Sequence, residues 1–313
     1  MKRFNRWMLL ICVILIGVFF TTVPASAAAG KKLVKEYTYK QYIKKNGAWK
    51  FNENTGVKHH KDIFKYNKKG DPEKITTKEY LKSGKTKSSS VKIKYTFKKG
   101  KKTKRKVYSK ITEYKKGVPV STLIDSEDGY GRFFRYKFKS RYGTEVVFRD
   151  IDPHVEEEDI NTITMTFKVK TSNGLPVKIT GNAPGGFPVT MTFYTTGAKK
   201  GLVKKVIYDD TRTMSDGQVE VDKRVFKYTY TVKKGQIVKS VRTCSWFFGY
   251  TTLDGDKYSD EGLEKTEYKT EFKFKYTAKK TDNKRSCAML NDIVANLEQD
   301  DAYGRPVLYT YWY

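Results

Sequence analysis

The sequence predicts an all-β protein, an irregular antiparallel β-hairpin repeat that forms a large meander or an open barrel. Three observations support this fold class. Apolar and polar residues alternate strictly in many short runs, these runs are separated by polar turns that end in glycine, and aromatic residues are abundant, with 23 Tyr and 18 Phe. The aromatic content also argues against a disordered chain, although 31% of the residues are charged.

The alternation is clearest in residues 91–98, where one face of the predicted strand carries Val91, Ile93, Tyr95 and Phe97 and the other carries lysine and threonine. The same period of two recurs in four further segments, 164–170, 189–193, 225–233 and 271–277. Parallel strands are usually apolar on both faces. A single apolar face therefore indicates half-buried strands of an antiparallel sheet.

Seven short polar turns separate these runs, and glycine closes each of them, at Gly70, Gly100, Gly117, Gly143, Gly174, Gly201 and Gly235. Glycine tolerates the positive φ angles that tight hairpin turns and their bulges require. Each turn therefore predicts a β-hairpin. The uneven spacing of the glycines makes the repeat an irregular one.

The C-terminal part departs from this rhythm. Apolar residues recur at helical spacing, which predicts one helix near 286–298 built on Met289, Leu290, Ile293, Val294 and Leu297. Residues 307–313 alternate again and predict a final strand that closes the sheet. Since no segment in between is long enough to be a linker, we expect a single β-repeat domain over residues 30–313.

The first 29 residues have the pattern of a secretory signal peptide. Three basic residues precede an uncharged apolar run at 8–20, and small residues follow Pro24. The run is shorter than the ~20 residues that a membrane-spanning helix needs. We therefore expect residues 1–29 to be removed, the protein to be secreted and cell-wall associated, and no integral membrane segment to remain after cleavage.

The strong positive charge predicts an anionic partner. The chain has 63 Lys and Arg against 34 Asp and Glu, a formal net charge of +29. Solubility alone needs a net charge of only about 2–8 on a small domain. Because catalytic sequence motifs are absent, we predict a non-enzymatic protein. It would be retained at the cell surface or wall through electrostatic binding to an anionic wall or extracellular polymer.

Two alternative functions stay open. A secreted enzyme that hydrolyses an anionic polysaccharide would need two carboxyl groups roughly 5–10 Å apart. Its candidate acid and base are Asp150, Asp152 and Glu156. An extracellular nucleic-acid binder would also use a basic surface, but the sequence contains no nucleic-acid-binding motif.

The seven turns carry a further pattern, an aromatic residue, a short polar turn and a glycine followed by an alternating strand, and two of them show it best. They are FKYNKKGDPEKI (64–75) and YTVKKGQIVKSV (230–241). In this respect the chain resembles the secreted bacterial YD-repeat proteins, although the Tyr-Asp pair itself is missing from these turns. The resemblance implies a β-repeat fold and association with the wall or surface, and it implies no catalytic residue.

The densest aromatic cluster is the candidate ligand-binding site, and it consists of Trp246, Phe247, Phe248 and Tyr250. If exposed, these rings would stack on sugars or bases, and if buried they would belong to the core. The two cysteines beyond the signal, Cys244 and Cys287, form either one disulfide or two buried thiols.

A calcium site is the one cofactor that the sequence suggests. The oxygens of Asp254, Asp256 and Asp260 recur as in calcium loops, but Lys265 stands where an EF-hand has its bidentate glutamate. Another set of potential metal ligands, His59, His60 and Asp62, is flanked by lysines. We interpret that set as a surface loop, because adjacent strand residues would point to opposite faces.

Overall fold

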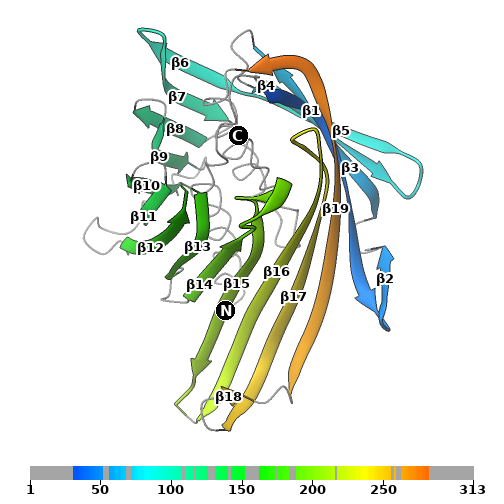
Figure 1. The fold of residues 1–313 in the computed structure, drawn as a ribbon, viewed down its shortest axis with the longest axis vertical. Helices are drawn as coiled ribbons and strands as arrows, with labels where there is room; N and C mark the ends of the chain where they lie inside the picture. The colour runs from blue at the N-terminus through cyan, green and yellow to red at the C-terminus, as the bar shows by residue number, and fades with distance from the viewer. Residues whose placement is uncertain are drawn as a thin grey trace.

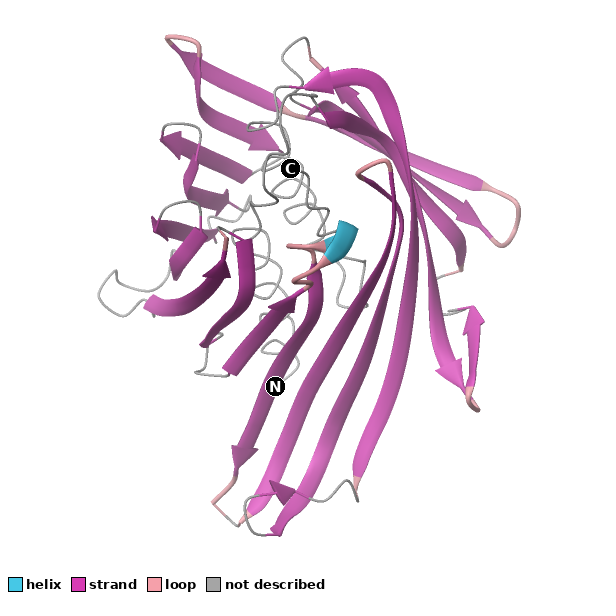
Figure 2. Cartoon of the chain, viewed as in Figure 1, coloured by secondary structure: helices cyan, strands magenta, loops and turns pink. Residues whose placement is uncertain are grey.

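The computed structural model is almost entirely antiparallel β-sheet (Figures 1 and 2). The residues that it describes are 31–51, 56–67, 72–107, 110–115, 118–125, 131–139, 142–151, 162–173, 175–182, 188–215, 217–254, 257–258 and 262–281.

Nineteen strands make up the sheet. The first nine are β1 (Lys31–Lys45), β2 (Ala48–Phe51), β3 (Val57–Tyr66), β4 (Pro72–Leu81), β5 (Thr86–Lys92), β6 (Lys94–Lys98), β7 (Lys101–Val107), β8 (Lys110–Lys115) and β9 (Val118–Asp125). The others are β10 (Gly131–Lys139), β11 (Tyr142–Ile151), β12 (Thr162–Ser172), β13 (Leu175–Asn182), β14 (Pro188–Phe193), β15 (Val203–Thr213), β16 (Gln218–Lys233), β17 (Gln236–Asp254), β18 (Lys257–Tyr258) and β19 (Leu263–Thr281).

Most strands pair with the next strand in the chain. This meander runs from β6 to β17, and a second, shorter one runs from β3 to β5. The exception is β1, which pairs with β2 and β3 along one edge and with β19 along the other. Because β1 is the first strand and β19 the last, the two ends of the described chain lie side by side (Figure 1). The other edge of β19 pairs with β17.

The sheet bends round strongly (Figure 1). The strands at its two ends are β5 and β6, which follow one another in the chain. β5 pairs with β4 and β6 pairs with β7, and only Ile93 separates β5 from β6. The backbone N–H of Ile93 donates to the carbonyl of Glu73 on β4 at 2.9 Å. Within the described residues no ladder joins β5 to β6, so the sheet does not close through hydrogen bonds.

One face of the sheet, here called the inner face, carries most of the core, although Val219 and Val221 of β16 are buried on the opposite face. The buried side chains of the inner face include Tyr37, Tyr39, Phe64, Ile75, Val91, Met191, Val206, Tyr208, Tyr228, Phe272 and Phe274. The intervening residues of β16 and β19, such as Lys227, Thr229 and Lys273, are exposed on the opposite, outer face. The predicted alternation of apolar and polar faces is therefore confirmed.

Six of the seven predicted glycine turns fall between two strands that pair with one another, whereas Gly143 lies inside β11, opposite Phe138 of β10. At Lys99-Gly100 the φ angles are 49° and 71°, and at Lys234-Gly235 they are also 49° and 71°. Two successive positive φ angles match the right-handed twist of the flanking strands. Sequence analysis missed a further turn of this kind, Asn46-Gly47, which joins β1 to β2.

The described residues contain no α-helix; one short 3-10 turn, η3 (Gly197–Lys199), precedes β15 (Figure 2). The predicted signal peptide (1–29), the predicted helix near 286–298 and the predicted strand 307–313 lie outside the described residues. A search of the described part of the chain found no helix with the length and apolar character needed to span a membrane.

Candidate functional site

The four aromatic residues predicted to bind a ligand are divided between the two faces of β17. Neighbouring residues of a strand point to opposite faces. Trp246 and Phe248 share the inner face, with ring centroids 4.7 Å apart. On the outer face, the Lys265 ammonium lies 5.5 Å from the ring centroid of Phe247. Tyr250 is 52% exposed. The four rings therefore do not form one continuous surface.

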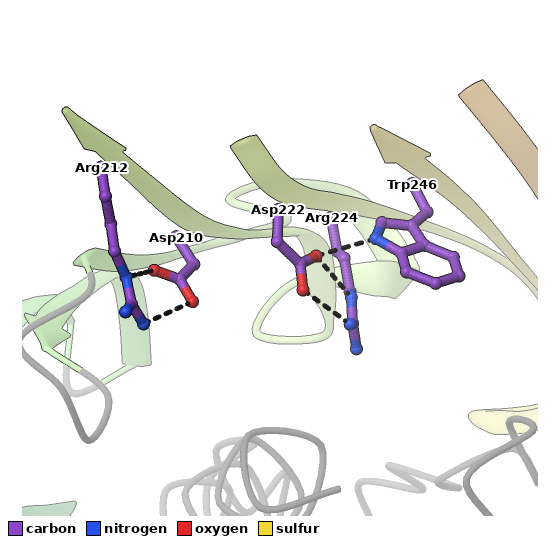
Figure 3. Close-up of polar contacts among 5 residues, drawn as sticks. All are labelled: Asp210, Arg212, Asp222, Arg224 and Trp246. Atoms are coloured by element: carbon purple, nitrogen blue, oxygen red, sulfur yellow. Dashed lines mark hydrogen bonds and ion pairs between the residues drawn. The ribbon is translucent and has the colours of Figure 1, made fainter. Parts of the chain in front are cut away.

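Trp246 belongs to a hydrogen-bonded cluster with two residues of β16 (Figure 3). Its indole N–H donates to Asp222 Oδ1 at 2.8 Å, and Arg224 donates to both Asp222 oxygens at 3.1 and 3.0 Å. The Arg224 guanidinium also lies 4.9 Å from the Trp246 ring centroid. The side chains of Arg224 and Asp222 are only 11% and 15% exposed. These contacts hold the indole in place and cover one of its faces.

A similar ion pair lies on the adjacent strand β15. Arg212 donates to the two Asp210 oxygens at 2.8 and 3.2 Å, and Asp210 lies directly opposite Asp222 in the ladder (Figure 3). Burial raises the pKa of Asp210, and hydrogen bonding to Arg212 only partly opposes this effect. Because each carboxylate accepts two hydrogen bonds from a guanidinium, the row primarily fixes the positions of its own side chains.

Cys244 lies on the inner face, opposite Phe226 on β16 and Tyr268 on β19. Burial raises the pKa of its thiol to about 11. Such a thiol is a poor nucleophile at neutral pH, since the thiolate is the reactive form. Its predicted partner Cys287 lies outside the described residues, so the disulfide stays a prediction.

The residues 59–62 belong to strand β3, whereas the sequence indicated a surface loop. His60 and Asp62 are buried on the inner face, 7% and 8% exposed, and the His60 ring stacks on Tyr39 at 4.5 Å. His59 points to the outer face and stacks on Tyr80 at 4.2 Å. The two histidines thus lie on opposite faces, as strand geometry requires.

The predicted metal and acid–base residues fall mostly outside the described part of the chain. Asp254 ends β17 and Asp150 lies in β11, while Asp152, Glu156, Asp256 and Asp260 are not described. Among the described side chains, no group of three or more His, Cys, Asp or Glu is arranged to hold a metal ion. The calcium loop and the carboxylate pair therefore stay predictions.

Several outer-face lysines of β1, β3, β17 and β19 form ion pairs with carboxylates. Glu36 on β1 bridges Lys61 and Lys275, with both N–O distances at 2.9 Å. Glu267 on β19 accepts from Lys44 at 2.8 Å, and this hydrogen bond is the largest cause of its lowered pKa. Glu271, Lys239 and Lys269 form a similar group. The positive charge of this region is therefore partly compensated, with three glutamates against five lysines.

A second set of outer-face lysines crosses β3 to β7 and lies opposite one another in register. Lys65 pairs with Lys74 and Lys74 with Lys92, and then Lys94 pairs with Lys106. Adding the neighbouring Lys104, we define the lysine band as Lys65, Lys74, Lys92, Lys94, Lys104 and Lys106. Directly opposed residues have Cβ atoms about 4.5–5.5 Å apart. The band therefore consists of two rows of closely spaced amines, one across β3, β4 and β5 and one across β6 and β7, and only Ile93 separates them along the chain.

Among the described residues, carboxylates form ion pairs with only two lysines of the band, Lys65 and Lys104. Lys65 lies 3.4 Å from Glu73, and Lys104 lies 3.1 Å from Glu113. Within the described part of the chain, none of the four lysines between them forms a recorded ion pair. Residues 80–107 contain eleven Lys, one Arg and no Asp or Glu. This composition is visible in the sequence, but only the strand pairing gathers the lysines into a band.

The comparisons with known proteins leave the family open. No family model matches the chain, and no curated protein matches it. Among solved structures, the chain is similar to a porin-like protein from Bacteroides uniformis, with a TM-score of 0.43 and 12% identity. That similarity covers 77% of this chain and 96% of the other. A similarity of this degree assigns no function, so the functional argument depends on the side chains.

Proposed function

We propose that the protein is exported, has no catalytic activity and is held at the cell surface or wall by electrostatic binding to an anionic polymer. The lysine band is the contact surface. The observation that carries this proposal is the set Lys74, Lys92, Lys94 and Lys106, two directly opposed lysine pairs that form no ion pair with a carboxylate of the described residues.

The directly opposed lysines of the band lower the stability of the protein when no polymer is bound. Like charges directly opposite one another destabilise a β-ladder by a fraction of a kcal/mol to about 1 kcal/mol. A polyanion laid across the band would remove this repulsion and release its own condensed counterions. Lysine suits such a role because its ammonium is a point charge on a flexible stem, which tolerates an irregular polymer.

The test measures binding to purified anionic wall polymer as a function of salt. We expect the logarithm of the affinity to fall linearly with the logarithm of the salt concentration. Changing Lys74, Lys92, Lys94 and Lys106 to Gln should lower that slope by about 3, at 0.7–0.9 per lost contact. A matched control changes four ion-paired lysines to Gln, namely Lys61, Lys239, Lys265 and Lys275.

The control removes the same total charge, so it separates the band from net charge. We expect it to lower the slope by less than 1, because these lysines already have carboxylate partners. Equal effects of the two variants would refute the band as the contact surface. Binding that does not change between 0.1 and 1 M salt would refute electrostatic retention altogether. A marked preference for nucleic acid over wall polymer would favour the nucleic-acid alternative.

A further inference from the structure

Three aromatic rings gather on the outer face where the β1–β2 hairpin leaves the sheet. Tyr42 on β1 pairs with Phe51 on β2, and Lys44 pairs with Trp49. The Tyr42 and Phe51 rings meet edge to face, with centroids 6.0 Å apart and an interplanar angle of 84°. We call Tyr42, Trp49 and Phe51 the β2 platform. All three rings are half-buried on the side of the sheet away from the core.

Amines surround these rings. The Lys269 ammonium lies 4.3 Å from the ring centroid of Tyr42 and 5.4 Å from that of Trp49. Lys44 lies 5.9 Å from the Trp49 ring, and Lys82 lies 6.0 Å from the Phe51 ring. The carboxylates Glu267 and Glu271 hold Lys44 and Lys269 in these positions.

The position of the rings does not follow from the needs of the core. On β1 the core residues include Tyr37 and Tyr39, which face the inner side and contact Phe274 and Phe272. The outer positions of the neighbouring strands carry mostly lysine, glutamate and threonine. Three large rings at one outer location, with cations beside each of them, match a ligand that offers both apolar faces and negative charge.

We infer that the β2 platform binds the sugar rings of an anionic polysaccharide, while the surrounding lysines meet its acidic groups. This inference rests on the proposed function and specifies its ligand, because aromatic stacking would distinguish a glycan from a polyanion without rings. Sugar rings have apolar faces that can lie on an aromatic ring, and their acidic groups would meet the neighbouring amines, of which Lys269 lies over one face of Tyr42.

A lipid surface fits the platform less well. Membrane-anchoring aromatic residues protrude and enter the boundary between headgroups and acyl chains. The rings of the β2 platform are half-buried, and amines lie within 4.3–6.0 Å of their centroids. Inserting these rings would carry ammonium groups and their bound carboxylates into an apolar medium, which is strongly unfavourable.

The experiment compares the purified protein with Trp49→Thr and Phe51→Thr variants. The probes are polygalacturonate, inorganic polyphosphate and phosphatidylglycerol vesicles at one fixed salt concentration. Phe247→Thr is the matched control, since Phe247 is another half-buried outer-face ring with a lysine at 5.5 Å, but it lies outside the platform. Thermal unfolding checks that each variant is folded, and the two platform variants test the same inference independently.

We expect each platform variant to weaken polygalacturonate binding about tenfold, as for the loss of one stacked ring, and to change polyphosphate binding less than twofold. The control should leave both unchanged. The inference would be overturned if the platform variants lost binding to both polymers equally, lost binding to neither, or lost binding to the vesicles alone. The lysine-band variant should bind both polymers more weakly than the parent protein. If it binds both as tightly as the parent, the proposed function fails, whatever the platform variants do.

Discussion

Lys94 on β6 lies directly opposite Lys106 on β7, so that two like charges face each other across an antiparallel ladder. We expect Lys106→Glu to stabilise the free protein by about 0.5–1 kcal/mol at low salt, because it replaces repulsion by attraction. Urea unfolding at low and at high salt would measure this change. The gain should shrink at 1 M salt as the charges are screened. An unchanged or lower unfolding midpoint at low salt would contradict the prediction.

The contact between Asp222 and Trp246 predicts a large loss of stability on truncation. Asp222→Ala leaves the Arg224 guanidinium and the indole N–H of Trp246 without their shared acceptor in a site only 11–15% exposed. We expect a loss of about 2–4 kcal/mol in the free energy of unfolding. Denaturant titration would measure it. Asp209→Ala is the control, since Asp209 pairs with Lys223 at a more exposed site and should cost less than about 1 kcal/mol.

His59 predicts a loss of stability on acidification. Burial is the largest cause of its lowered pKa, and the nearby Lys40, Lys61 and Lys58 lower it further, below the ordinary value of 6.5. At a pH between the lowered pKa of His59 in the folded protein and its ordinary pKa in the unfolded chain, the unfolded chain binds more protons. The free energy of unfolding therefore falls as the pH drops below about 6.5. We expect His59→Phe to lose less stability than the parent between pH 7 and pH 5. Parallel stability curves for the two proteins would contradict this.

Gly249 on β17 should not tolerate a side chain. Its φ angle is +137°, and a Cβ atom there would lie 2.7 Å from the carbonyl oxygen of Gly262. We expect Gly249→Ala to destabilise the protein by more than about 2 kcal/mol, through both strain and the clash with backbone. Gly100→Ala is the control, because it has a positive φ of +71° but open space around it. Equal melting temperatures for the two variants would refute this reading.

The predicted disulfide between Cys244 and Cys287 can be tested directly. We expect the unreduced, unfolded protein to resist alkylation by iodoacetamide at both positions, with mass spectrometry as the measurement. Alkylation of two thiols would show that the bond is absent. In the reduced, folded protein Cys244 should react at least tenfold more slowly than after unfolding, because burial raises its pKa to about 11.

Local patterns in the sequence predicted many of the strands and most of their turns, although they missed the turn at Asn46-Gly47. Tyr228, Tyr230, Phe272 and Phe274 are buried where the period of two places them, because side chains of a strand must alternate between faces. The turn at Gly235 could be predicted for the same kind of reason, since only certain residues adopt a positive φ without cost. These features depend on a few neighbouring residues, which the sequence displays directly.

Pairings between distant segments could not be read from the same patterns. Nothing in the sequence of β1 indicates that Tyr39 lies beside Phe272 on β19, because any apolar face of a strand can pack against any other. The same limit applies to both proposed contact surfaces. Lys74, Lys92 and Lys106 become one band, and Lys269 comes to lie above Tyr42, only after strand register is set. The sequence determined which side chains share a face, and the tertiary structure decided which faces meet, since register is a property of two strands together.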